Sequence, residues 1–191
     1  MTVEPIRSRR KIKQLISHME ENYTWRDTLL FRTGINTILR VGDLLKLRYC
    51  DIFDEKDRFR RYLVLRENKT KKEKKIPLNT KIRKAIKEYC EYYELEGEDH
   101  LFFSYKDPSR PIDRIRAWRI LKKAAVECGI ENMGSHSMRK TLAYHIYKET
   151  KNIVLVMHML NHQSSKQTLS YIGVTQDSMD NVYKDPKFQL G

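Results

Sequence analysis

The stretch that decides the fold runs from residue 135 to residue 171 and reads SHSMRKTLAYHIYKETKNIVLVMHMLNHQSSKQTLSY. Its apolar residues recur at helical intervals, and residues that favour helix N-termini separate the apolar groups. The sequence predicts three helices here: one capped by Ser135 that runs through Tyr147, one over residues 151–160, and one capped by Ser164 or Ser165 that leads into Tyr171. This part of the chain is therefore predicted to be helical.

Most of the remaining chain shows the same helical periodicity. Further helices are predicted over residues 5–21, from about residue 25 onward behind Thr24, over 41–47, over 80–93 behind Asn79 or Thr80, and over 112–128. Gly34 is expected to loosen or end the second of these, and Arg40 is expected at the entrance of the third. Short strands are predicted near residues 62–65, 76–78 and 101–103, with a basic turn joining the first two. The predicted fold class is mainly α with a small antiparallel β-sheet.

Composition limits the size and the class of the protein. The 191 residues suit one compact domain, and 40% apolar residues suffice for a core beneath a surface rich in charge. The formal net charge is +13, which attracts polyanions such as nucleic acid or an anionic membrane. Charge alone does not choose between these two partners.

Several classes of protein are excluded by what the sequence lacks. The longest nearly apolar run, residues 153–160, is far shorter than the roughly 20 residues that cross a bilayer. The first residues carry no apolar segment of a secretory signal, so the protein is expected to stay inside the cell. Cys50, Cys90 and Cys128 are far apart and form no CxxC pair, which predicts free thiols rather than disulfides or a thiolate zinc site.

Six polar residues occur along the chain in the order Arg40, Lys69, His136, Arg139, His162 and Tyr171. His136 and Arg139 are three positions apart, so one helical face presents both. Arg139 and His162 are 23 positions apart, and His162 and Tyr171 are nine apart. This order and spacing resemble the tyrosine recombinase, or phage integrase, family. The stretches that carry the resemblance are Thr33-Gly34, Arg40-Val41-Gly42-Asp43-Leu44-Leu45-Lys46-Leu47 with Asp51-Ile52, Lys69-Thr70 before Ile76-Pro77-Leu78, His136-Ser137-Met138-Arg139, Leu160-Asn161-His162 and Tyr171-Ile172.

The resemblance extends from about residue 5 almost to the end of the chain, and it implies the helical catalytic-domain fold of the family. It also implies a reaction in which a tyrosine oxygen attacks a DNA phosphodiester, displaces a 5′-hydroxyl and leaves a 3′-phosphotyrosine. A hydroxyl of a second strand then reverses the step, so neither ATP nor a cofactor is implied. The implied roles are Tyr171 as nucleophile, Arg40 and Arg139 as phosphate clamp, His136 and His162 as groups that hold the phosphate and move the tyrosine proton, and Lys69 as the acid that protonates the departing oxygen.

The residue types suit these roles. Arginine is permanently charged and offers a planar fork of donors to the negative charge of a reacting phosphate. A phenol with a pKa near 10 needs nearby positive charge or a base in order to attack at neutral pH. Imidazole, with a pKa near 6.5, is suited to move that proton, and the sequence leaves open which histidine is the base.

Other interpretations compete at individual positions. Lys69 belongs to a basic run with Lys71, Lys72, Lys74 and Lys75, which by default is a solvated turn that attracts phosphate. His158 and His162 are four positions apart, but they lack the glutamate of a HExxH zinc motif, so no metal site is predicted.

Two positions depart from the family pattern: Ile38 stands where a small glycine is common, and Asn161 replaces the glycine before His162. Asparagine tolerates left-handed backbone angles, whereas Ile38 leaves the path of the chain near Arg40 open.

The resemblance implies double-stranded DNA as the partner, self-assembly on that DNA, and an accessory DNA-binding protein as a further candidate partner. We expect one catalytic domain over residues 1–191, with a C-terminal tail from about residue 175 and no upstream DNA-binding domain. A naturally short protein and a fragment of a longer one are both compatible with this. The alternative functions are a DNA-binding regulator without recombinase activity, a type IB topoisomerase-like nicking and closing enzyme, and a basic helical module that binds RNA.

Overall fold

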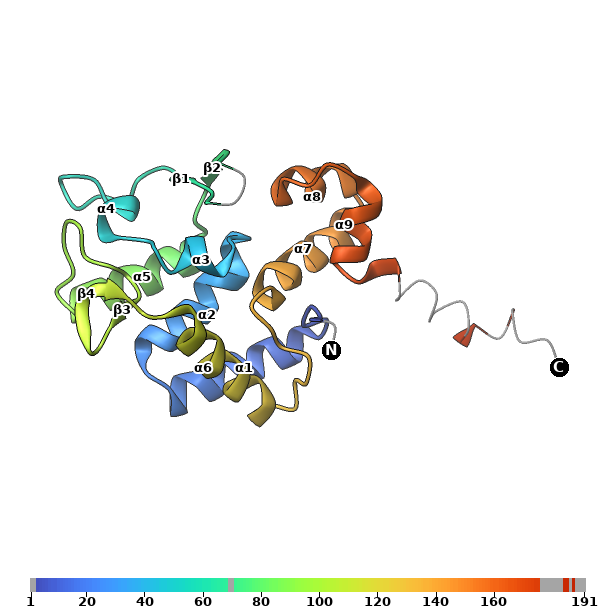
Figure 1. The fold of residues 1–191 in the computed structure, drawn as a ribbon, viewed down its shortest axis with the longest axis horizontal. Helices are drawn as coiled ribbons and strands as arrows, with labels where there is room; N and C mark the ends of the chain where they lie inside the picture. The colour runs from blue at the N-terminus through green and yellow to red at the C-terminus, as the bar shows by residue number, and fades with distance from the viewer. Residues whose placement is uncertain (1–2, 69–70, 176–183, 186, 188–191) are drawn as a thin grey trace.

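The computed structural model describes residues 3–68, 71–175, 184, 185 and 187. Within these residues the fold is mainly helical with two small antiparallel sheets, as predicted (Figure 1). The elements are α1 (Arg9–Asn22), α2 (Trp25–Thr37), α3 (Val41–Leu44), α4 (Tyr49–Ile52), β1 (Leu63–Arg66), β2 (Glu73–Ile76), α5 (Thr80–Tyr92), β3 (Phe103–Ser104), β4 (Asp107–Pro111), α6 (Arg114–Glu127), α7 (Ser137–Thr150), α8 (Ile153–Leu160) and α9 (Ser165–Tyr171).

Helix α2 lies at the centre of the fold and packs against α1, α5, α6 and α7. The Thr24 side chain accepts a hydrogen bond from the Asp27 backbone amide and caps the helix, as predicted. The prediction that Gly34 loosens or ends this helix is wrong, because α2 continues to Thr37. A Cβ atom at position 34 would lie 2.4 Å from the sulfur of Met138, so the glycine instead lets α7 pack closely against α2.

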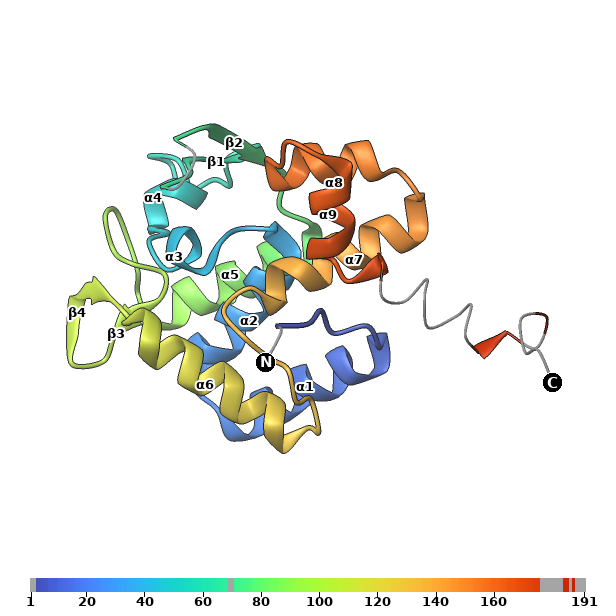
Figure 2. The same ribbon diagram turned by 45° about the vertical axis from the view of Figure 1, so that its right-hand side comes forward.

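The two sheets are hairpins that project from the helical core. Strands β1 and β2 pair antiparallel, with Leu63 opposite Ile76 and Arg66 opposite Glu73, which confirms that two strands pair here. The second strand, predicted at residues 76–78, instead covers Glu73–Ile76, because residues assigned to the basic turn hydrogen-bond to β1. The third predicted strand forms only at its end, where β3 pairs with β4. Figure 2 shows β2 beside α8, and the Lys74 ammonium donates a hydrogen bond to the Met159 carbonyl of that helix. The first hairpin is thereby attached to the C-terminal helices.

A second cluster of buried side chains joins Ile38, at the end of α2, to the C-terminal helices. Ile38 packs with Ala143, Tyr144, Val156, Leu160 and Ile172. Its backbone is left-handed, with φ 55° and ψ 16°, a conformation that strains a β-branched residue. The chain therefore follows here the path that glycine would favour. The buried isoleucine side chain packs between α2 and the C-terminal helices, and this packing offsets the backbone strain.

Helix boundaries differ from the prediction in a few places. Ser135 does not cap α7; the N-cap residue is His136, whose side chain makes no capping hydrogen bond. Asp113 caps α6 and was not predicted to do so, and α4 was not predicted at all. Asn79 and Ser164 cap α5 and α9 as predicted. Most of the expected C-terminal tail lies outside the described residues.

The described part of the chain contains no helix with both the length and the apolar character needed to span a bilayer.

Candidate active site

The two arginines of the predicted phosphate clamp lie together near α3 and α7. Arg40 is the N-cap residue of α3 and has extended backbone angles, so its side chain leaves the chain just before the helix begins. Arg139 lies in the first turn of α7 and is almost fully buried. One of its terminal nitrogens donates to the Ile38 carbonyl at 2.9 Å, and the other donates to the Leu160 carbonyl at 2.7 Å. Arg139 is thus fixed between the ends of α2 and α8.

Tyr171 lies at the end of α9 and faces both predicted histidines. Its hydroxyl lies 3.3 Å from Nδ1 of His136. The His162 ring contacts the Tyr171 ring edge to face, with 5.0 Å between ring centroids, and His162 Nδ1 lies 3.2 Å from the Thr168 hydroxyl. The Lys140 ammonium lies 5.0 Å from the centroid of the Tyr171 ring. Five of the six predicted residues, Arg40, His136, Arg139, His162 and Tyr171, therefore come together in one place.

Positive charge and partial desolvation set the protonation of these groups. Burial raises the pKa of the Tyr171 phenol, while the charges of Arg139 and Arg40 and a hydrogen bond from Arg139 act in the opposite direction. The pKa of His136 lies below 6.5, first because of desolvation and then because of Arg139 and other cations that include Arg114 and Arg40. The pKa of His162 is lowered by the same two causes. Both imidazoles are consequently neutral at pH 7, which is the form able to accept a proton.

The free energy of unfolding is expected to decrease as the pH falls below 6.5. Four histidines have folded-state pKa values below that figure, namely His100, His136, His145 and His162. The unfolded chain therefore takes up protons at these positions before the folded chain does, and stability present above pH 6.5 is lost toward the lower folded-state values. Denaturant unfolding curves recorded above and below pH 6.5 measure this change in the free energy of unfolding. His162→Asn should weaken the dependence, and a slope equal to that of the original protein would contradict the prediction.

Lys69 lies outside the described residues, but the structure places both sides of the turn that carries it. The Asn68 amide donates to the Asp43 carboxylate at 3.0 Å, beside the helix that begins after Arg40. On the other side, the Lys71 amide donates to the Glu67 carbonyl at 2.9 Å. The described residues on both sides of positions 69 and 70 are therefore attached next to the arginine cluster.

Two further residues of the site were missed by the sequence analysis. Glu67 is fully buried, and one of its carboxylate oxygens lies 2.7 Å from Arg40 Nη1 and 3.3 Å from Arg139 Nη1. Lys74 lies 3.4 Å from the same oxygen, and burial together with Arg139 lowers its pKa to about 8. Nothing in the basic run distinguished Lys74 from its neighbours. The signal for Glu67 was its place at the end of a strand among cations, which is also typical of a solvated charge.

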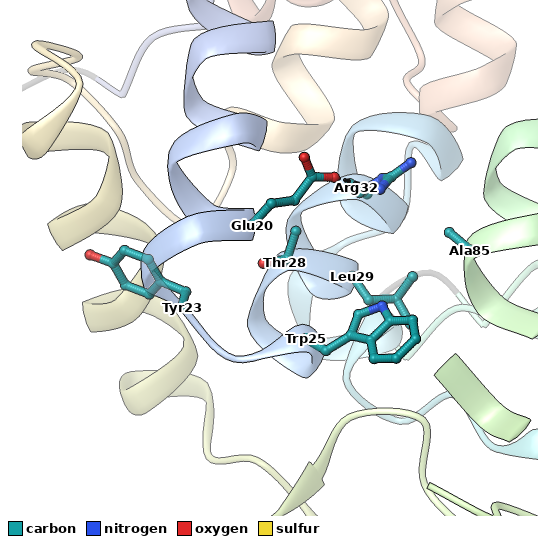
Figure 3. Close-up of a pocket in the computed structure, with 7 residues that line it drawn as sticks. All are labelled: Glu20, Tyr23, Trp25, Thr28, Leu29, Arg32 and Ala85. Atoms are coloured by element: carbon teal, nitrogen blue, oxygen red, sulfur yellow. Dashed lines mark hydrogen bonds and ion pairs between the residues drawn. The ribbon is translucent and has the colours of Figure 1, made fainter. Parts of the chain in front are cut away.

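A pocket that is partly open to solvent lies elsewhere in the molecule. Figure 3 shows it between α1, α2 and α5, with a volume of about 310 Å³. It is lined by Glu20, Tyr23, Trp25, Thr28, Leu29, Arg32 and Ala85, and Arg32 donates to Glu20 at 2.8 Å. None of the clustered polar residues lines it. The candidate active site is therefore the arginine, histidine and tyrosine cluster, which fits a polymer substrate that lies across the surface.

The described residues contain no group of three or more His, Cys, Asp or Glu side chains arranged to hold a metal ion.

Comparison with known proteins agrees with the geometry. Residues 8–177 match the phage integrase family. The chain belongs to this family. A probable integrase/recombinase of Bacillus subtilis, YoeC, is 40% identical over 182 residues, which cover 95% of this chain and 96% of that protein. The tyrosine recombinase XerD of Chlamydia pneumoniae is 28% identical over 170 residues, 84% of this chain. That match covers 54% of XerD, so the chain spans about half of this family member.

A solved structure of the same family shares the fold. The crystal structure of the XerH recombinase bound to its difH substrate, in a post-cleavage complex, aligns with a TM-score of 0.71 and 16% identity. The alignment covers 96% of this chain and 54% of XerH. The tyrosine recombinase catalytic-domain fold predicted from the sequence is thus confirmed.

Proposed function

We propose that the protein is a site-specific DNA recombinase that cleaves and rejoins DNA through a 3′-phosphotyrosine intermediate. The observation that carries the proposal is the position of the Tyr171 hydroxyl, 3.3 Å from a His136 nitrogen and close enough to Arg139 and Arg40 for their charges to act on its pKa. Nucleophilic attack on a phosphodiester requires a nucleophile, a base that accepts its proton, and positive charge that stabilises the phosphate oxygens. Tyr171, His136 and the two arginines are groups of these three kinds. Membership of the phage integrase family supports the same chemistry.

The proposed reaction begins with binding of the scissile phosphate. Arg40 and Arg139 bind the non-bridging oxygens of the scissile phosphate and offset the charge that grows on them. His136 takes the proton of Tyr171 while the phenol oxygen bonds to phosphorus, and His162, which packs against the tyrosine ring, helps to hold the phosphate. Lys69 donates a proton to the 5′-oxygen as the bond between phosphorus and that oxygen breaks. Rejoining reverses these transfers with a hydroxyl of another strand.

The partner is double-stranded DNA, and the protein assembles on it inside the cell. The support for DNA is the net charge of +13 together with exposed basic residues near the site. Arg114, at the start of α6, is close enough to lower the pKa of His136. Self-assembly is supported by strand exchange itself, because a hydroxyl of a second cleaved strand must reach each phosphotyrosine. Residues 1–191 act in this as one catalytic domain.

The experiment that tests the function uses DNA from the genetic element that encodes the protein. Incubation is followed by denaturing electrophoresis for covalent protein–DNA adducts and by analysis of the DNA for recombinants. Adducts with recombinants support the proposal. Relaxed plasmid without recombinants would instead indicate a topoisomerase-like activity, and binding without any adduct would indicate a regulator.

Binding to DNA of arbitrary sequence is expected to depend strongly on salt. Six to ten phosphate contacts correspond to a loss of about a thousandfold or more in affinity between roughly 50 and 200 mM salt. Fluorescence anisotropy with a labelled duplex measures the slope of log affinity against log salt. Arg114→Gln should reduce the slope by about 1. Lys123→Gln, near the other end of α6 where Lys123 pairs with Glu127, is the matched control. A flat dependence would exclude phosphate contacts as the main source of affinity.

A further inference from the structure

The buried carboxylate of Glu67 links four parts of the active site. Its Oε1 atom lies 2.7 Å from Arg40 Nη1, 3.3 Å from Arg139 Nη1 and 3.4 Å from Lys74 Nζ. Its Oε2 atom accepts a hydrogen bond from the Asn161 side chain at 2.7 Å. These partners come from the start of α3, from α7, from β2 and from the end of α8, and Glu67 itself directly follows β1.

Charge explains why a carboxylate stands at this position. Arg40, Arg139 and Lys74 are close enough to repel one another, and both arginines contribute to the lowered pKa of Lys74. Glu67 acts in the opposite direction on Lys74, on Arg139 and on His162. An ionised carboxylate without solvent exposure is stable only when it is paired, so the cations and the carboxylate stabilise one another.

The two arginines depend on Glu67 to different degrees. Arg139 also donates to the Ile38 and Leu160 carbonyls, which fix its guanidinium without any help from the carboxylate. Among the described residues, the only ion pair of Arg40 is the one with Glu67. Arg40 Nη1 has hydrogen-bond geometry with no partner among the described residues, so the negative charge of Glu67, rather than a directed hydrogen bond, draws Arg40 toward Arg139.

We propose that Glu67 is a positioning residue, which holds Arg40 beside Arg139 before DNA binds and attaches the end of β1 to both. The inference rests on the proposed recombinase function. Glu67 is covalently part of the β1–β2 connection, and its backbone amide donates to the Lys72 carbonyl at 3.0 Å across that connection. Its side chain meanwhile reaches the arginines and Asn161, the residue before His162. One residue thus joins the two arginines to the described ends of the β1–β2 connection.

The decisive variant is Glu67→Gln, which keeps the shape of the side chain and an oxygen for Asn161 but removes the charge. With DNA from the genetic element that encodes the protein, at saturating concentration, the rate of covalent adduct formation should decrease on the order of 100-fold, because a catalytic group misplaced by about 1 Å costs a factor of that order. Affinity for the duplex should stay equal or increase, because a negative charge near the phosphate has gone. Glu67→Asp retains the charge and should recover part of the rate.

Glu73→Gln is the matched control, because Glu73 belongs to the same hairpin but is exposed and, among the described residues, forms its only ion pair with Lys75. It should form adducts at a rate within about twofold of the original protein, since exposed ion pairs contribute little. An unchanged rate in Glu67→Gln would overturn the proposal. A parallel loss of rate, duplex affinity and melting temperature would also overturn it, because that result indicates a role in folding alone.

A second measurement separates this inference from the proposed function. The side-chain Nε–Hε signals in NMR spectra report whether a guanidinium is held in place, and they need no DNA. In Glu67→Gln the Arg40 signal should lose its dispersion or broaden, whereas the Arg139 signal should persist. If the original protein forms no adduct but Arg40 behaves in this way, the recombinase function fails and the positioning role stands. If adducts form and the Arg40 signal is unaffected, the positioning role fails.

Discussion

Tyr171→Phe is expected to abolish covalent adduct formation without weakening DNA binding. The substitution removes the hydroxyl that lies 3.3 Å from His136 Nδ1, and without that oxygen no bond to phosphorus forms. The aromatic ring remains, so its contacts with His162 and with the Lys140 ammonium remain too. Adduct formation should fall below detection, and duplex affinity should match that of the original protein. Denaturing electrophoresis and anisotropy measure the two quantities.

The matched control is Tyr147→Phe, a partly buried tyrosine of α7 that packs in the second cluster. This variant should form adducts at the original rate. Mass spectrometry of the adduct peptide should assign the DNA to Tyr171. Assignment to Tyr144, to Tyr147 or to Tyr183, the last of which lies outside the described residues, would overturn the choice of nucleophile.

Much of this site was predicted from the order and spacing of its residues, which resemble those of the tyrosine recombinase family. Helices α7, α8 and α9 span the interval from Arg139 through His162 to Tyr171. Apolar periodicity and capping residues predict the lengths of these helices. Once a helix is capped at Ser164, its end at Tyr171 follows from its length. Asn161 adopts the left-handed angles expected of it, with φ 55° and ψ 39°. Local rules were therefore sufficient for the helices, and the family resemblance selected the site residues on them.

The features that the sequence did not reveal depend on contacts between distant segments. Glycine inside a helix usually weakens it, and only the approach of Met138 shows why Gly34 instead lies within a continuous helix. The left-handed Ile38 is explained only by side chains more than a hundred positions away. Glu67 resembles a solvated charge in a basic turn until folding surrounds it with Arg40 and Arg139. Burial and charge pairing of this kind are properties of the tertiary structure.

Loss of the general acid is expected to reduce the rate of DNA cleavage strongly. The 5′-oxygen is a poor leaving group without a proton, so loss of the acid should slow cleavage on the order of 100- to 10,000-fold. The structure offers a rival to Lys69 in Lys74, whose pKa is lowered to about 8 by burial and by Arg139. That value suits proton donation near neutral pH. However, the Lys74 ammonium already donates to the Met159 carbonyl at 2.5 Å and lies 3.4 Å from Glu67, contacts that tie it to the protein.

Substrates with sulfur in place of the bridging 5′-oxygen distinguish the two lysines, because a thiolate leaves almost without a proton. Lys69→Ala is expected to be severely slowed on normal DNA and nearly restored on the sulfur substrate. Lys74→Ala should be impaired equally on both, since its loss disturbs Glu67 and thereby Arg40 rather than the transfer of a proton. Lys72→Ala, in the same turn, is the matched control and should cleave both substrates at close to the original rate. Rescue of Lys74→Ala instead of Lys69→Ala would assign the acid to Lys74, and the turn that begins at Asn68 would then act in DNA binding alone.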